Sequence, residues 1–124
     1  MAKEIIRDDD GKPWSKWKPA AKFAFVWERD GFDGGDPDLE FRFHPSRRWR
    51  FDYAWPELMI AVEIDGFGFG HQSQQGIGGQ NEKRNAAIEL GWRVLVFDSR
   101  TLGSKQGVAD AVEQVCRVLM IAAG

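Results

Sequence analysis

The chain has 124 residues, of which 43% are hydrophobic and 29% charged, and a formal net charge of −2. These values are ordinary for one globular domain with one core, and the apolar stretches are too short and too interrupted by charge for a membrane span. A single cysteine excludes an internal disulfide. The N-terminus has no signal-peptide pattern, so we expect a cytoplasmic protein.

Hydrophobic periodicity and Gly/Pro breaks predict a single α/β domain over residues 1–124. Within this domain, residues 1–18 are expected to form an N-terminal arm. Three strands should form an antiparallel meander, and the fourth should pair parallel after a helix crossover, which gives a mixed four-stranded sheet flanked by helices. A loop rich in Gly, Gln and Ser is expected at 66–79. In chain order, the predicted elements are a helix at 20–29, strands at 39–44, 49–55 and 59–64, a helix at 80–90, a strand at 92–97 and a helix at 108–122.

Two of the predicted strands alternate between apolar and polar residues. Alternation predicts that the large apolar side chains of each strand share one face. In the first strand these are Leu39, Phe41 and Phe43, and in the second they are Trp49, Phe51, Tyr53 and Trp55, opposite Asp52 and Ala54.

Three carboxylates lie on the second and third predicted strands. A reversal after Pro56 would set Asp52 beside Glu63, and the two-residue period sends Glu63 and Asp65 to one face. Converging carboxylates repel each other unless a cation neutralises them, and oxygen ligands suit Mg²⁺ or Mn²⁺. The alternative is a set of solvated strand-end acids. Against it, Glu63 interrupts an apolar strand, where a carboxylate needs a partner or a metal.

A basic strip directly precedes the first of these acids. Such a strip can bind phosphate even on a slightly acidic protein, although a solvated hairpin turn is the alternative interpretation. Its members are Arg42, His44, Arg47, Arg48 and Arg50.

Two other segments have features of nucleic-acid-binding or nucleotide-binding motifs. Trp14 and Trp17, interleaved with lysines, would either stack on bases or pack on the domain, and we favour packing. The run at 66–70 is rich in glycine but lacks the Gly-Lys-Ser/Thr ending of a nucleotide-binding loop, so no nucleotide cofactor is expected.

Taken together, several motifs in chain order resemble the PD-(D/E)XK nuclease superfamily over roughly residues 20–100. The similarity is to small phage and bacterial endonucleases, to archaeal-type Holliday junction resolvases and to very-short-patch repair endonucleases. The motifs are the arginine-rich segment 47–56 with Asp-Tyr and Trp-Pro, Val-Glu-Ile-Asp-Gly at 62–66, His71, Lys-Arg-Asn at 83–85 and Gly-Trp-Arg-Val at 91–94.

The resemblance implies a restriction-endonuclease-like core in the order α-β-β-β-α-β-α. It also implies a metal held by Asp52, Glu63 and the carbonyl of Ile64. The chain departs from the pattern at Asp65, where the family has lysine. Lys83 is our candidate for a relocated lysine, with Gln80 as second choice.

Three more residues acquire expected roles from the resemblance. Glu28 would be the first-helix acid, although a solvated residue beside Arg29 is the alternative. Asp65 would either contact the residues that bind the metal, without binding it directly, or bind a second metal ion. His71 would contact a phosphate or transfer a proton, although an exposed histidine without a role in the Gly-rich loop is the alternative.

The function that the resemblance implies is a Mg²⁺- or Mn²⁺-dependent DNA endonuclease in DNA recombination or repair, in a bacterial or phage-infected cell. A homodimeric Holliday junction resolvase acting on branched DNA is the favoured form. The alternatives are a nicking repair or restriction-like endonuclease, and a non-catalytic DNA-binding module with a decayed site.

Overall fold

The structure is a computed structural model that describes residues 5–32, 34–65 and 74–124. The predicted order of helices and strands is confirmed. The helices are α1 (Pro19–Asp30), α2 (Gln74–Glu89) and α3 (Lys105–Ala123), with short 3₁₀ turns η1 (Trp14–Lys16) and η3 (Thr101–Gly103); the strands are β1 (Asp38–Arg42), β2 (Arg50–Trp55), β3 (Ile60–Asp65) and β4 (Arg93–Asp98).

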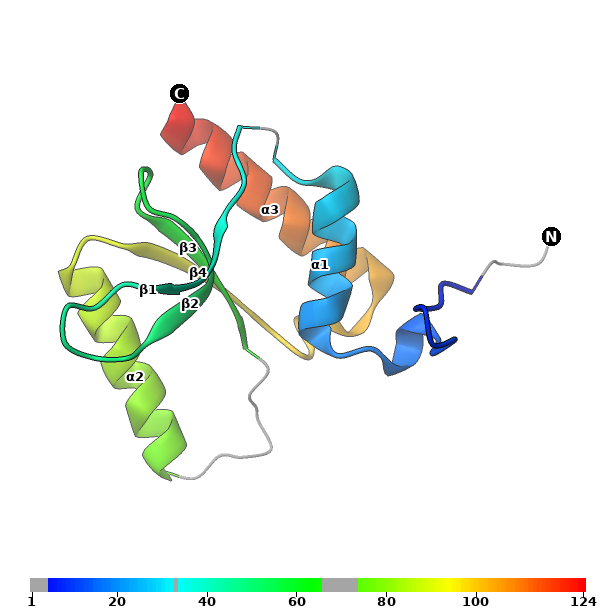
Figure 1. Ribbon diagram of the computed structural model, residues 1–124, viewed down its shortest axis with the longest axis horizontal. Helices are drawn as coiled ribbons and strands as arrows, with labels where there is room; N and C mark the ends of the chain where they lie inside the picture. Colours follow the sequence, from blue (N-terminus) through cyan, green and yellow to red (C-terminus); the bar gives the residue numbers. More distant parts are fainter. Residues whose placement is uncertain (1–4, 33, 66–73) are drawn as a thin grey trace.

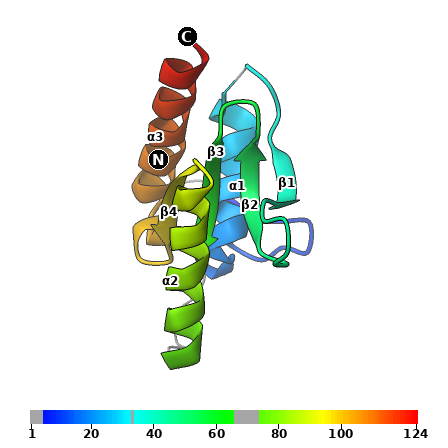
Figure 2. The ribbon, with the colours of Figure 1, turned by 90° about the vertical axis from the view of Figure 1, so that its left-hand side faces the viewer.

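The sheet has the order β1-β2-β3-β4, in which β1, β2 and β3 are antiparallel neighbours and β4 runs parallel to β3. The predicted meander and parallel crossover are therefore confirmed. Helix α2 makes the crossover and covers one face of the sheet, while α1 and α3 cover the other (Figures 1 and 2). None of the described helices has the length and apolar character that a membrane span requires.

Local sequence explains where the helices begin and end. Pro19 begins α1 at a position where its missing N–H costs nothing. Ser104 caps α3 by accepting a hydrogen bond from the Gly107 N–H at 3.0 Å. Gly91, with φ of +94°, follows α2 in the left-handed conformation that a side chain disfavours. These signals lie within a few residues of each helix end. The last helix, predicted at 108–122, begins earlier than expected, at Lys105.

Two hydrophobic clusters hold the layers together, one on each face of the sheet. The larger lies between the sheet and α1 and α3, and includes Phe23, Val62 and Leu119. The smaller lies under α2, around Phe51 and Trp92. Each face is covered, so apolar side chains must leave the sheet in both directions.

The predicted alternation in the first two strands is wrong. Leu39 pairs with Tyr53, and both line a pocket on the α1 side, whereas Phe41 pairs with Phe51 in the cluster under α2. Between them, Glu40 has φ of +51°, a left-handed conformation. This kink redirects the following side chains to the other face, so both faces receive aromatic rings.

The loop expected at 66–79 is corrected in part. Residues 74–79, predicted as loop, belong to α2. Their glycines lower helix propensity, but a helix once nucleated extends cooperatively into such a segment. Residues 66–73 lie outside the described part.

Part of the N-terminal arm packs on the domain through Ile6, Trp14 and Trp17. Trp14 is only 6% exposed and its ring lies 5.2 Å from Trp17 and 5.8 Å from Phe25. The packing interpretation of the two tryptophans is confirmed.

Candidate active site on the α2 face of the sheet

The site begins where the pairing of β2 with β3 ends. The regular ladder runs from Trp55↔Ile60 to Tyr53↔Val62. One residue further on, the Asp52 Oδ2 atom accepts the Ile64 N–H at 2.6 Å. The carboxylate thus takes the place that a backbone carbonyl has in a regular ladder. Extending the register by one pair sets Asp52 opposite Glu63, as the predicted hairpin requires.

Lys83 reaches this point from α2. Its Nζ atom donates to Glu63 Oε1 at 2.6 Å, and the two side chains are 14% and 18% exposed. Strand β3 directs Ile60, Val62 and Ile64 into the larger cluster, so the intervening Glu63 faces α2. The crossover helix therefore brings a cation to the predicted acid, and Lys83, the candidate for the relocated lysine, faces the sheet.

Phe51 forms a floor beside the lysine. The Lys83 ammonium lies 5.9 Å from the centre of the Phe51 ring, which is fully buried. At this distance the ring's negative face attracts the ammonium. Lys83 is therefore held from two sides, by the Glu63 carboxylate and by an aromatic ring.

Several effects act in opposite directions on the pKa of Asp52. Burial raises the pKa of Asp52 above its ordinary value of 3.8, although the Ile64 N–H opposes this. The charge of Glu40 adds to the rise in pKa, and that of Lys83 reduces it. The ionised carboxylate is therefore costly in the folded protein, and an added cation would lower that cost.

The donor set fits a hard divalent cation in part. Asp52 and Glu63 offer carboxylate oxygens on neighbouring strands, and the Ile64 peptide lies against Asp52. Among the residues that the structure describes, no three His, Cys, Asp or Glu side chains form a metal-binding group. The third predicted acid, Asp65, pairs with Asp98 through the backbone, but its side chain lies outside the described part.

One other predicted catalytic residue, Glu28, lies apart from this group. Glu28 is exposed on α1, where it lines a pocket of about 730 Å³ with Tyr53, on the face of the sheet opposite α2. Burial raises the pKa of Tyr53, and the charges of Asp52 and Glu28 add to the rise. The Gln80 side chain and all of His71 lie outside the described part.

The basic strip forms the hairpin between β1 and β2. Arg42 and Arg50 are exposed cross-strand partners. Like charges directly opposite each other are unfavourable, and an anion between them would relieve the repulsion. Arg48 is exposed in the turn. These three arginines remain candidates for phosphate contact.

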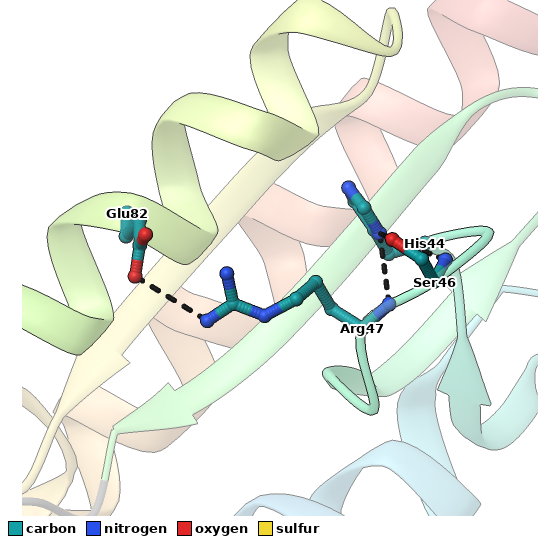
Figure 3. A network of polar contacts seen from close by, with 4 residues as sticks. All are labelled: His44, Ser46, Arg47 and Glu82. Atoms are coloured by element: carbon teal, nitrogen blue, oxygen red, sulfur yellow. Dashed lines mark hydrogen bonds and ion pairs between the residues drawn. The ribbon is translucent and has the colours of Figure 1, made fainter.

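The other two members of the strip have partners within the protein. Figure 3 shows Arg47 pointing from the hairpin toward Glu82 of α2. The two side chains form an ion pair of 3.3 Å, and the Arg47 guanidinium lies 4.0 Å from the centre of the Trp49 ring. His44 Nδ1 accepts the backbone N–H groups of Ser46 and Arg47, at 3.1 and 3.0 Å. His44 therefore shapes the hairpin turn, and Arg47 ties the turn to α2.

The sequence interpretation missed four participants. Trp49, Glu82, Phe51 and the Ile64 amide all contact predicted site residues. Phe51 and Ile64 adjoin predicted acids in the chain, and that proximity was an available signal. The partnership of Arg47 with Glu82 joins residues 35 positions apart and has no local signal.

Comparison of the chain with protein-family models, with curated proteins and with solved structures found no match. The function of the chain is therefore inferred from its own geometry and chemistry.

Proposed function

We propose that the chain is a metal-dependent DNA endonuclease of the PD-(D/E)XK type, with a restriction-endonuclease-like core. The observation that carries the proposal is the Lys83 Nζ atom at 2.6 Å from Glu63 Oε1, beside Asp52 on the neighbouring strand. Two acids on paired strands and a lysine from the next helix supply the parts of a phosphodiester hydrolase.

The carboxylates of Asp52 and Glu63, with the carbonyl of Ile64, would hold Mg²⁺ or Mn²⁺. The chemistry that such a cation supplies is neutralisation of charge on the phosphate and activation of water. The raised pKa of Asp52 supports this assignment, because a carboxylate that is costly to ionise gains from a cation.

The chain's own residues have separate tasks in this proposal. The Ile64 N–H fixes one Asp52 oxygen and so orients the carboxylate. Glu63 and Phe51 fix the Lys83 ammonium. From that position, Lys83 orients the attacking water by hydrogen bonding and stabilises negative charge that develops on the phosphate.

The substrate in this proposal is DNA, preferably branched. The arginine pair Arg42 and Arg50, with Arg48, supplies positive charge on the hairpin beside the active site. Arginine contacts to phosphates respond to the path of the DNA backbone and carry no base sequence. Paired cuts in a four-way junction need two active sites related by a twofold axis, so a homodimeric Holliday junction resolvase is the specific form we propose.

The test is cleavage of supercoiled plasmid and of a synthetic four-way junction, in Mg²⁺ and in EDTA. Wild type should cut only with the metal. Asp52→Asn and Glu63→Gln should reduce the cleavage rate at least about a hundredfold. The matched controls are Asp110→Asn and Glu113→Gln, which alter exposed acids of α3 and should cut like wild type.

A second candidate is a non-catalytic DNA-binding module. It is favoured by one departure, Asp65 at the position where the family pattern has lysine. Binding to the junction without metal-dependent cutting would support this candidate and contradict the enzyme. Cutting by wild type but not by Lys83→Ala would support Lys83 as the replacement for the missing lysine.

A further inference from the structure

A groove of about 380 Å³ lies between the β1–β2 hairpin and α2. It is on the α2 face of the sheet, and Glu82 in its wall directly precedes Lys83 in the chain. Its hairpin side is formed by His44, Arg47 and Trp49, and its helix side by Glu82, Asn85 and Glu89.

The aromatic part of the groove is rigidly supported. The Trp49 ring stacks on Phe43, with centroids 6.2 Å apart and planes 15° apart. Phe43 in turn stacks on the buried Phe51 ring at 4.0 Å and 5°. His44 packs edge-on against Trp49 at 5.3 Å. Trp49 is therefore a fixed surface that needs no ordering before a ligand stacks on it.

The Trp49 ring already carries a flat group. The Arg47 guanidinium, a planar cation, lies 4.0 Å from its centre. The ring face is thus accessible to a planar partner from the groove. The guanidinium is held there by an ion pair between side chains that are 47% and 60% exposed, and such a contact is weak. A better-stacking ligand can displace it.

Charge in the groove selects the kind of planar ligand. Glu82 and Glu89 line its helix wall and repel a phosphate. Their carboxylates, with the amide of Asn85, are acceptors for the amino group of a nucleobase. The groove therefore suits a neutral ring with N–H donors, while the phosphates of the same strand stay on the arginines outside it.

We propose that this groove binds one unstacked base of the DNA, which stacks on Trp49 in place of the Arg47 guanidinium. The proposal deepens the nuclease proposal and depends on it, since it names how branched DNA is told from regular duplex. A branch point offers bases that have lost a stacking neighbour, whereas paired DNA does not. Arg47, once displaced, is available to a phosphate.

The experiment compares three labelled duplexes of the same sequence in EDTA, so that cutting does not interfere. One is fully paired, one has a single bulged adenine, and one has an abasic site at the same bulge. The abasic bulge keeps the backbone bend and the charge but has no ring. Wild type should bind the adenine bulge at least about fivefold more tightly than the abasic bulge, as expected for one stacked base.

Two variants separate stacking from fold. Trp49→Leu should bind both bulges equally, while Trp49→Phe should keep most of the adenine preference. Thermal unfolding identifies any variant that has lost its fold, and the Phe variant then decides. Equal binding of the two bulges by wild type would overturn the base site, as would a folded Trp49→Phe that behaves like Leu. Metal-dependent cleavage could persist in those cases. Absence of all DNA binding and cutting would instead overturn the nuclease proposal and this one together.

Discussion

Two neighbouring residues of α2, Glu82 and Lys83, make two very different ion pairs. Glu82 meets Arg47 at 3.3 Å between side chains that are 60% and 47% exposed. Lys83 meets Glu63 at 2.6 Å between side chains that are 14% and 18% exposed. The first pair ties the hairpin to the helix, and the second ties the helix to the sheet.

The difference shows that surroundings set the strength of an ion pair. Water screens the Arg47–Glu82 pair, so its contribution to stability is small. The Lys83–Glu63 pair is largely withdrawn from water, where a charge without its counter-charge is costly. A pair of that kind is also well placed for chemistry, because its charges act on a substrate with little screening.

Of the variants that test this difference between the two ion pairs, Lys83→Met should have the largest effect on stability. The variant keeps the apolar stem and removes the ammonium from the partly buried Glu63 carboxylate. We expect the free energy of unfolding to fall by about 1–3 kcal/mol. Urea denaturation measures it, with Lys105→Met as an exposed control on α3. A stability equal to that of wild type would mean that the Lys83–Glu63 pair is as weak as the Arg47–Glu82 pair.

Divalent metal should stabilise the protein through Asp52 and Glu63, and this gain should not depend on the Arg47–Glu82 pair. At free Mg²⁺ ten times its Kd, a single site adds about 1.4 kcal/mol to the unfolding free energy of wild type. Glu82→Gln should gain as much, because it lies outside the site. Asp52→Asn should gain much less. Thermal melts in Mg²⁺ and in EDTA measure these gains, and an equal gain in Asp52→Asn would place the metal elsewhere.

The pH dependence of stability should distinguish Asp52 from exposed acids. Burial raises its pKa in the folded state above the ordinary 3.8, so the folded protein binds this proton more tightly than the unfolded chain. The contribution of Asp52 to stability therefore falls as the pH rises from 3.8 through the folded-state pKa.

Asp52→Asn removes that loss, because its amide oxygen can still accept the Ile64 N–H while carrying no charge. The variant should gain stability relative to wild type as the pH rises across that window. Urea melts in EDTA at a series of pH values measure this, with Asp110→Asn as control. A difference from wild type that is independent of pH would refute the assignment.

The smallest effect on stability should come from breaking the Arg47–Glu82 pair. Glu82→Gln should change the unfolding free energy by less than about 0.5 kcal/mol, because the pair is exposed. Raising the salt concentration should remove even this difference. Urea melts at low and high salt test it against Glu113→Gln. A loss comparable to that of Lys83→Met would mean that the hairpin contact is a main support of the fold.

Much of the fold could be predicted because its signals are local. The strand periods, the reversal after Pro56 and the glycine at 91 all act within a few residues. Lys83 was a candidate because the resemblance allows a lysine on the following helix and the crossover rule places that helix against the sheet, but its contact with Glu63 was not predicted.

The rest depends on contacts that no local pattern encodes. The left-handed backbone at Glu40 turns Phe41 toward the α2 face, where its register partner Phe51 also lies, and strict alternation cannot foresee it. The Ile64 N–H finds Asp52 only because the β2–β3 ladder ends there. Such features depend on how the aromatic side chains are divided between the two covered faces of the sheet, which is a property of the whole domain.

Metal binding by Asp52 and Glu63 is best tested with a crystal structure of the protein grown with Mn²⁺ and measured for anomalous scattering. We expect a manganese peak in contact with the carboxylates of Asp52 and Glu63. Manganese bound elsewhere, or a site between these strands with no peak, would contradict this expectation.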